Sequence, residues 1–447
     1  MSVSRTYLLD PLYETETLKL PPSRTDLAVI GAGVALSAVH GVAVPGILGT
    51  LTCIVPAAVA GALALVKTGG STVVERAGRR GGHALRKRAL ARAVRRYEAK
   101  QDLGEPEVEQ ALPHHTVFTR INDLVWHERD GYAFPQGGGR LLAAFEWVTD
   151  GAALKDGAHR DRAHDALAAF LEWVAATGHG SCVRIVHAVS PYAGERDVRA
   201  EQGGDLADSY RELMSMVNAA CDVHATVIML SVPAHGADVE EETAWARAAF
   251  EQAQVCGIET GRMWDRPTWD IALAPIRGGD LYEIHEGLFR SGDFVTATAT
   301  VTDFRRGERA PDFWRPMITT LPRVTRTTVV EYLPLDRRRA EKRLETGEML
   351  RTATARDEQD VRREKTSTRT GRRAAELHEQ DISDGAAYVK VAAQIMIQAR
   401  DEADLKEFRR DVEQNAVSVG AHLAWMDKEH ERGWHAALPI PGGEITC

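Results

Sequence analysis

Apolar residues dominate one long stretch near the start of the chain. Residues 27–66 contain no Asp, Glu, Lys or Arg. As helix, this stretch of about 40 residues would be roughly 60 Å long, about twice the thickness of a bilayer's hydrocarbon core. Pro45 and Gly46 divide it into two nearly equal halves. The pattern therefore predicts a two-helix transmembrane hairpin over 27–66 with its tight turn at Pro45 and Gly46.

The alternative is a buried helical hairpin of a soluble protein. Two amphipathic helices would show a polar face, and here little beyond Ser37, His40 and a few Thr interrupts the apolar run. Against a membrane location, the stretch holds no Trp, Tyr or Phe that would form an aromatic belt. Small residues at four-residue spacing, such as Gly33 and Ser37, would let two helices pack closely in lipid. This balance favours the membrane hairpin.

The charge pattern changes abruptly after this stretch. Residues 67–100 carry a net charge of +9, and residues 1–66 carry a net charge of −1. Because the whole chain has a net charge of −9, residues 101–447 carry −17. By the positive-inside rule, the basic segment lies in the cytoplasm. We therefore expect a multi-pass plasma-membrane protein with both termini cytoplasmic. The flanking basic residues expected to contact lipid are Lys67, Arg76, Arg79, Arg80, Arg86, Lys87, Arg88, Arg92, Arg95 and Arg96.

Nucleic acid is the other polyanion that such a basic segment fits. A membrane-flanking position explains the charge without DNA, and only Tyr97 among the aromatic residues interleaves with the cations. The sequence therefore identifies no direct nucleic-acid site.

Strand and helix patterns alternate through the rest of the chain. After a basic segment and linker at 67–113, they predict an α+β fold with two cytoplasmic subdomains, 114–275 and 276–447, each a ferredoxin-like or similar sandwich. Residues 1–26 form an N-terminal cytoplasmic arm. Strands are expected at 115–126, 141–148, 182–190, 222–233, 281–286, 293–302, 324–333, 386–398 and 422–426, with helices at 158–177, 206–220, 239–256 and 401–420, and a short helix or turn at 311–321.

One further helix is expected over residues 336–379. It mixes Arg and Glu on nearly every face. Such a helix either bridges two domains or packs on another chain. The alternative is a solvated helix that is stabilised by ion pairs one turn apart.

Sequence signatures of catalysis are absent from these 447 residues. There is no P-loop motif, no His-Glu-x-x-His, no Cys-x-x-Cys and no Gly-x-Ser-x-Gly. The five cysteines are isolated, which excludes a disulfide scaffold. His422, His430 and His435 are the only candidate metal cluster near the C-terminus, and the alternative for each is a structural histidine. We expect no catalytic residue, no cofactor and no metal.

The order of the parts resembles a known family. An arm beginning at Tyr7 precedes the hairpin, Pro311 to Met317 reads PDFWRPM, a strand ends in Glu331 to Pro334, and residues 434–439 read WHAALP. This arrangement is similar to actinobacterial membrane proteins of conjugation-type (type IV) secretion. Their hairpin resembles that of PrgI proteins, and their soluble part resembles the N-terminal, non-motor domain of the type IV secretion ATPase.

The resemblance implies a non-catalytic inner-membrane scaffold of a DNA-transfer or secretion machine. Such a scaffold would dock a separate motor ATPase and work as a homo-oligomer or in a multi-subunit complex, with membrane lipid as a further partner. Two alternatives stay open. One is the EccE-type membrane component of type VII secretion, and the other is a membrane-tethered hydrolase that uses His, Asp or Glu.

Overall fold

The computed structural model describes two compact units. It covers residues 7–9, 24–43, 54–68, 71–102, 124–148, 157–177, 180–191, 222–234, 239–277, 282–291, 293–304, 307–309, 314, 317, 321, 324–335 and 388–441. Unit 1 comprises residues 1–12 with 106–447, and unit 2 comprises residues 13–105. The predicted turn at Pro45 and Gly46, the helix at 206–220 and the long helix at 336–379 lie outside the described residues.

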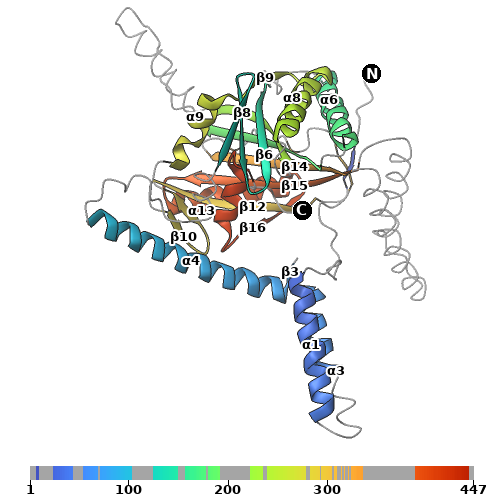
Figure 1. The fold of residues 1–447 in the computed structure, drawn as a ribbon, viewed down its shortest axis with the longest axis vertical. Coiled ribbons are helices and arrows are strands. Elements are labelled where there is room, and N and C mark those ends of the chain that lie inside the picture. The colour runs from blue at the N-terminus through green and yellow to red at the C-terminus, as the bar shows by residue number, and fades with distance from the viewer. Residues whose placement is uncertain are drawn as a thin grey trace, which may run out of the picture. The chain divides into compact units, whose positions relative to one another are not determined.

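Unit 1 is built on one 12-stranded sheet whose strand pairs are antiparallel (Figure 1). The strands run in the order β10-β11-β12-β15-β14-β7-β8-β6-β5-β4, while β16 pairs with β12 and β9 with β6. Their bounds are β4 Val125–Arg129, β5 Tyr132–Gly137, β6 Arg140–Trp147, β7 Cys182–Pro191, β8 Asp222–Pro233, β9 Thr260–Met263, β10 Tyr282–Ile284, β11 Phe289–Ser291, β12 Phe294–Phe304, β14 Thr325–Leu335, β15 Tyr388–Ala399 and β16 Ala421–Trp425.

The two expected sandwich subdomains are in fact joined through this sheet. Strand β7 from the first half pairs with β14 from the second, so that Val183 lies opposite Tyr332 and Val189 opposite Arg326. The predicted pair of separate sandwiches is therefore wrong. Alternating patterns locate strands in the sequence, but they do not determine which strands pair across a long separation.

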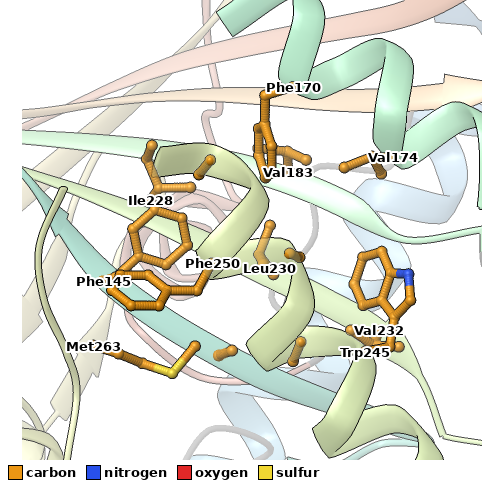
Figure 2. Close-up of a cluster of buried hydrophobic side chains, with 14 of the residues drawn as sticks. Phe145, Phe170, Val174, Val183, Ile228, Leu230, Val232, Trp245, Phe250 and Met263 are labelled. Atoms are coloured by element: carbon orange, nitrogen blue, oxygen red, sulfur yellow. The ribbon is translucent and has the colours of Figure 1, made fainter. Parts of the chain in front are cut away.

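Among the described elements, three helices cover one face of the sheet. They are α6 (Gly157–Ala176), α8 (Val239–Val255) and α13 (Glu402–Ser418). Where α6 and α8 pack on the sheet, Phe145, Phe170 and Leu230 are fully buried (Figure 2). Under α13, alternate residues of β12 and β15 form a second cluster. Cross-strand register places both clusters on the same face, because residues directly opposite in a sheet point the same way.

The short helix α14 (His430–Ala437) covers the other face. The amide of Gln394 donates to the Gly433 carbonyl oxygen over 2.8 Å. A Cβ at Gly433 would overlap the side chain of Thr298 on β12, so only glycine permits this close approach. The sequence predicted neither α14 nor its polar contacts with the sheet.

Several short elements complete unit 1. Strands β4 and β5 form a hairpin whose two-residue turn, Asp130-Gly131, has positive φ at both residues. This is the type I′ geometry that Asp-Gly favours. Helix α9 (Arg266–Arg277) follows β9. The arm's β1 (Tyr7–Leu9) pairs with β13 (Gly307–Arg309) and so belongs to unit 1.

The described part of unit 2 contains three helices, and a small ribbon connects the second of them to the third. They are α1 (Arg24–Ala43), α3 (Ile54–Leu65) and α4 (Val73–Asp102), and the ribbon pairs β2 (Lys67–Thr68) with β3 (Ser71–Thr72). Helices α1 and α3 lie side by side (Figure 1).

The predicted transmembrane hairpin is not borne out. Among the residues that the structure describes, no helix combines the length and the apolar character needed to cross a bilayer. Helix α3 has 12 residues, or about 18 Å, against a hydrocarbon core of about 30 Å. Helix α1 begins with Arg24 and Asp26 in its first turn, which leaves an uncharged part of only about 26 Å. The expected multi-pass plasma-membrane location depended on this hairpin, so the same finding contradicts that prediction.

Candidate functional site

Helices α1 and α3 of unit 2 are packed through small residues. A Cβ at Gly33 would overlap the Cβ of Ala60, so the two backbones approach as closely as glycine allows. The backbone N–H of Ala57 donates to the Ser37 hydroxyl oxygen over 3.0 Å. Ala64 is fully buried. Close packing of this kind makes α1 and α3 a single two-helix hairpin.

The outer surface of this hairpin is apolar and exposed. The large side chains that face solvent are Leu27, Val34, Leu36, Val39, Ile54, Val55, Val59 and Leu63, with exposed fractions from 39% to 66%. We call these eight residues the hairpin surface. Scattered single apolar residues are normal on a protein, whereas eight large ones on a single two-helix element favour an interaction surface.

Helix α4 begins at a capping box. The Glu75 carboxylate accepts from the Thr72 N–H over 2.8 Å, and the Thr72 hydroxyl oxygen accepts from the Glu75 N–H over 3.1 Å. These reciprocal bonds satisfy two N–H groups that a helix start leaves unpaired. The Thr-x-x-Glu signature at 72–75 is visible in the sequence and would have located this helix start.

The basic residues singled out from the sequence all fall in or next to α4. Lys67 lies in β2, and the other nine lie within α4. The side chains of Arg76, Arg79, Arg80, Lys87, Arg88 and Arg92 are exposed. The structure describes no side chain for Lys67, Arg86, Arg95 or Arg96. Helix α4 therefore presents a concentrated positive charge to solvent.

An open hollow of about 290 Å³ lies on unit 1 between the β4–β5 turn and the start of α9. Several of its charged side chains are held by ion pairs or by a ring contact. Arg247 pairs with Asp130, Arg129 lies 3.6 Å from Glu240, and the Arg266 guanidinium stacks 3.8 Å from the Trp126 ring centroid. These contacts tie the turn to α8 and α9, which gives the hollow a structural explanation.

A buried ion pair joins β7 to β14. The Arg184 Nε lies 3.7 Å from Glu331 Oε2, and both side chains are at most 4% exposed. Arg184 and Glu331 are cross-strand partners, and they directly neighbour the pair Val183 and Tyr332. Since successive residues of a strand point to opposite faces, the ion pair lies on the face opposite the large apolar core. Replacing a buried ion pair by apolar residues is often neutral, so this pair is weak evidence for added stability.

Two histidines meet on the neighbouring strands β7 and β8. The Nε2 of His187 lies 3.2 Å from Nδ1 of His224, and the Nδ1 of His187 lies 2.8 Å from the Thr226 hydroxyl. Burial, helped by the nearby His224 and Arg326, lowers the pKa of His187 to about 4. His187 is therefore neutral at pH 7.

The predicted candidate cluster of His422, His430 and His435 does not form a metal site. Among the described residues, no group of three His, Cys, Asp or Glu side chains is placed to hold a metal ion. Instead, His430 Nδ1 accepts from the Thr298 N–H over 3.0 Å, and its Nε2 lies 3.3 Å from Asp427. His430 thus fastens α14 to β12, which is the structural role the sequence left open.

Comparison with known proteins identifies no family for this chain. No family model matches the chain, and no curated protein matches it. The resemblance to conjugation-type secretion proteins therefore stays a prediction from the sequence.

Proposed function

We propose that this chain is a non-catalytic docking component of a conjugation-like DNA-transfer or secretion machine, which works with a separate motor ATPase. The hairpin surface is the observation that carries the proposal. A two-helix hairpin that exposes eight large apolar side chains is stabilised when a partner covers them.

The sequence supports the choice of machine. The order of arm, hairpin, basic segment and α+β region resembles components of type IV secretion, and the 447 residues contain no P-loop. In this proposal ATP hydrolysis is the task of another chain, and the hairpin of unit 2 is the docking element.

The test is affinity purification of the full-length tagged chain from its native cells, followed by identification of the co-purified proteins. We expect a P-loop ATPase of the secretion type in amounts comparable to the tagged chain. The hairpin variant Leu36→Asn/Val39→Asn removes two of the most exposed apolar side chains and should reduce the recovered ATPase at least several-fold.

A matched control comes from unit 1. Ile271 and Val417 are 75% and 76% exposed on α9 and α13, and Ile271→Asn/Val417→Asn removes a similar apolar area elsewhere. This control should recover the ATPase like the wild-type chain. Recovery of the chain without any ATPase contradicts the proposal, and so does equal recovery by the hairpin variant and the wild-type chain.

A further inference from the structure

Helix α4 carries a stripe of positive charge along its first half. Successive residues of an α-helix are rotated by about 100°, so Arg76, Arg80 and Lys87 point within about 40° of one another. Arg79 and His83 flank the same line. All three side chains of the central line are exposed to solvent, and they extend over roughly 16 Å of helix.

The charge on α4 is not balanced within the helix. Between Glu75 and Glu98 the sequence has nine Arg and Lys residues and no Asp or Glu. Like charges three and four residues apart, such as Arg76 and Arg80, repel and weaken a helix. Gly78 and Gly81 weaken it further, although a Cβ at either position would meet nothing within 4 Å. A bound polyanion would relieve the repulsion.

We infer that α4 binds the phosphate backbone of duplex DNA without reading its sequence. An α-helix of 10–12 Å diameter fits the major groove, which is about 12 Å wide. Arg and Lys side chains pair with the phosphate oxygens of any duplex, so a contact of this kind positions the helix on DNA without requiring a particular sequence. Tyr97 is the only aromatic residue of α4, which favours duplex over stacked single strands.

The rest of the chain confines this contact to α4. Residues 101–447 carry a net charge of −17, so the body of the protein repels a DNA duplex while the basic helix attracts it. This site deepens the proposed function, since it places a DNA contact on a transfer-machine component, but its chemistry rests on α4 alone.

The experiment measures binding of the full chain to a fluorescein-labelled 30-base-pair duplex by anisotropy at several salt concentrations. The test variant is Arg76→Gln/Arg80→Gln/Lys87→Gln, in which Gln keeps the helix propensity. The control variant, Arg400→Gln/Lys406→Gln/Arg410→Gln, removes three exposed cations at and within α13. Circular dichroism establishes that both variants retain the wild-type helix content.

The wild-type chain should bind with a logarithm of affinity that falls linearly with the logarithm of salt. Loss of three phosphate contacts flattens this slope by about 2.7, and the affinity near 0.1 M salt falls at least tenfold. The control variant should keep the wild-type slope. Two duplexes of unrelated sequence should bind within about twofold of each other.

Three results overturn the inference. They are no duplex binding by the wild-type chain, equal slopes for the two variants, and binding to phosphatidylglycerol vesicles without binding to the duplex. The ATPase recovery described above separates this failure from a failure of the proposed function, because the stripe variant leaves the hairpin surface intact. If the ATPase co-purifies with the chain but the chain does not bind the duplex, only the proposed DNA site is contradicted.

Discussion

The two units differ in the solvent exposure of their large apolar side chains. In unit 1, Phe145, Phe170 and Trp269 are completely buried between the sheet and its helices. In unit 2, Leu36, Val39 and Ile54 are each more than 60% exposed.

The difference lies in what each element can pack against. A 12-stranded sheet offers wide faces on which helices bury their apolar stripes. The α1–α3 hairpin packs along its small-residue seam, with α4 in contact with α3, and two helices cannot enclose a core. Unit 1 is therefore expected to be stable by itself, whereas the stability of the hairpin depends on a partner.

The largest effect should come from the core of unit 1. Phe145→Ala removes a fully buried ring that packs edge-on against Phe250 at a centroid distance of 5.2 Å. We expect the free energy of unfolding to fall by about 3–5 kcal/mol in urea titration. Leu36→Ala in the hairpin should change it by less than about 0.5 kcal/mol. Comparable losses for both variants would remove the contrast between the units.

The second effect is a pH dependence that arises from His187 in unit 1. The pKa of His187 is about 4 in the folded chain and 6.5 when unfolded, so the unfolded state binds the proton more readily. Stability is therefore fully present above pH 6.5 and is lost as the pH falls toward 4, by on the order of 3 kcal/mol. Unfolding of His187→Gln, followed from pH 7 to pH 4, should show a correspondingly flatter curve. An unchanged curve would show that His187 does not carry this dependence.

A third effect tests the seam of the hairpin. Gly33→Ala places a methyl group on Ala60, whereas Gly31→Ala meets nothing within 4 Å on the same helix. We expect Gly33→Ala to weaken the α1–α3 contact by about 1–3 kcal/mol. Amide hydrogen exchange in both helices should then speed up for Gly33→Ala and slow for Gly31→Ala. The seam is misassigned if both variants exchange alike.

The smallest effect should appear in α4. Gly78→Ala and Gly81→Ala add side chains in open space, and each should stabilise the helix by about 1 kcal/mol. Far-UV circular dichroism during heating is the measurement, with a rise in helix content expected. Lower helix content in either variant would mean that α4 needs its glycines.

Local sequence patterns predicted the main elements of unit 1 well. The strand expected at 222–233 is β8 with the same bounds, and the helix expected at 158–177 differs from α6 by one residue at each end. Both carry a clear period of hydrophobic residues. The eight-residue α14 was missed because so short a helix has too few turns to show a period.

The sequence did not show which strands pair or which polar side chains are buried. Arg184 lies in a strand that reads as half exposed, yet it is buried beside Glu331, which is 147 positions away in the chain. His187 and His224 meet only because β7 and β8 pair in one particular register. The membrane prediction failed for a related reason: a count of uncharged residues does not show where the helices begin and end.

The central claim is that the hairpin surface docks a motor ATPase. Its most direct test is an equilibrium titration of the purified full-length chain with the ATPase recovered from native cells. The account predicts that Leu36→Asn/Val39→Asn weakens binding at least about tenfold, while Ile271→Asn/Val417→Asn leaves the dissociation constant within about twofold of wild type. Equal binding by both variants, or no binding by the wild-type chain, would contradict it.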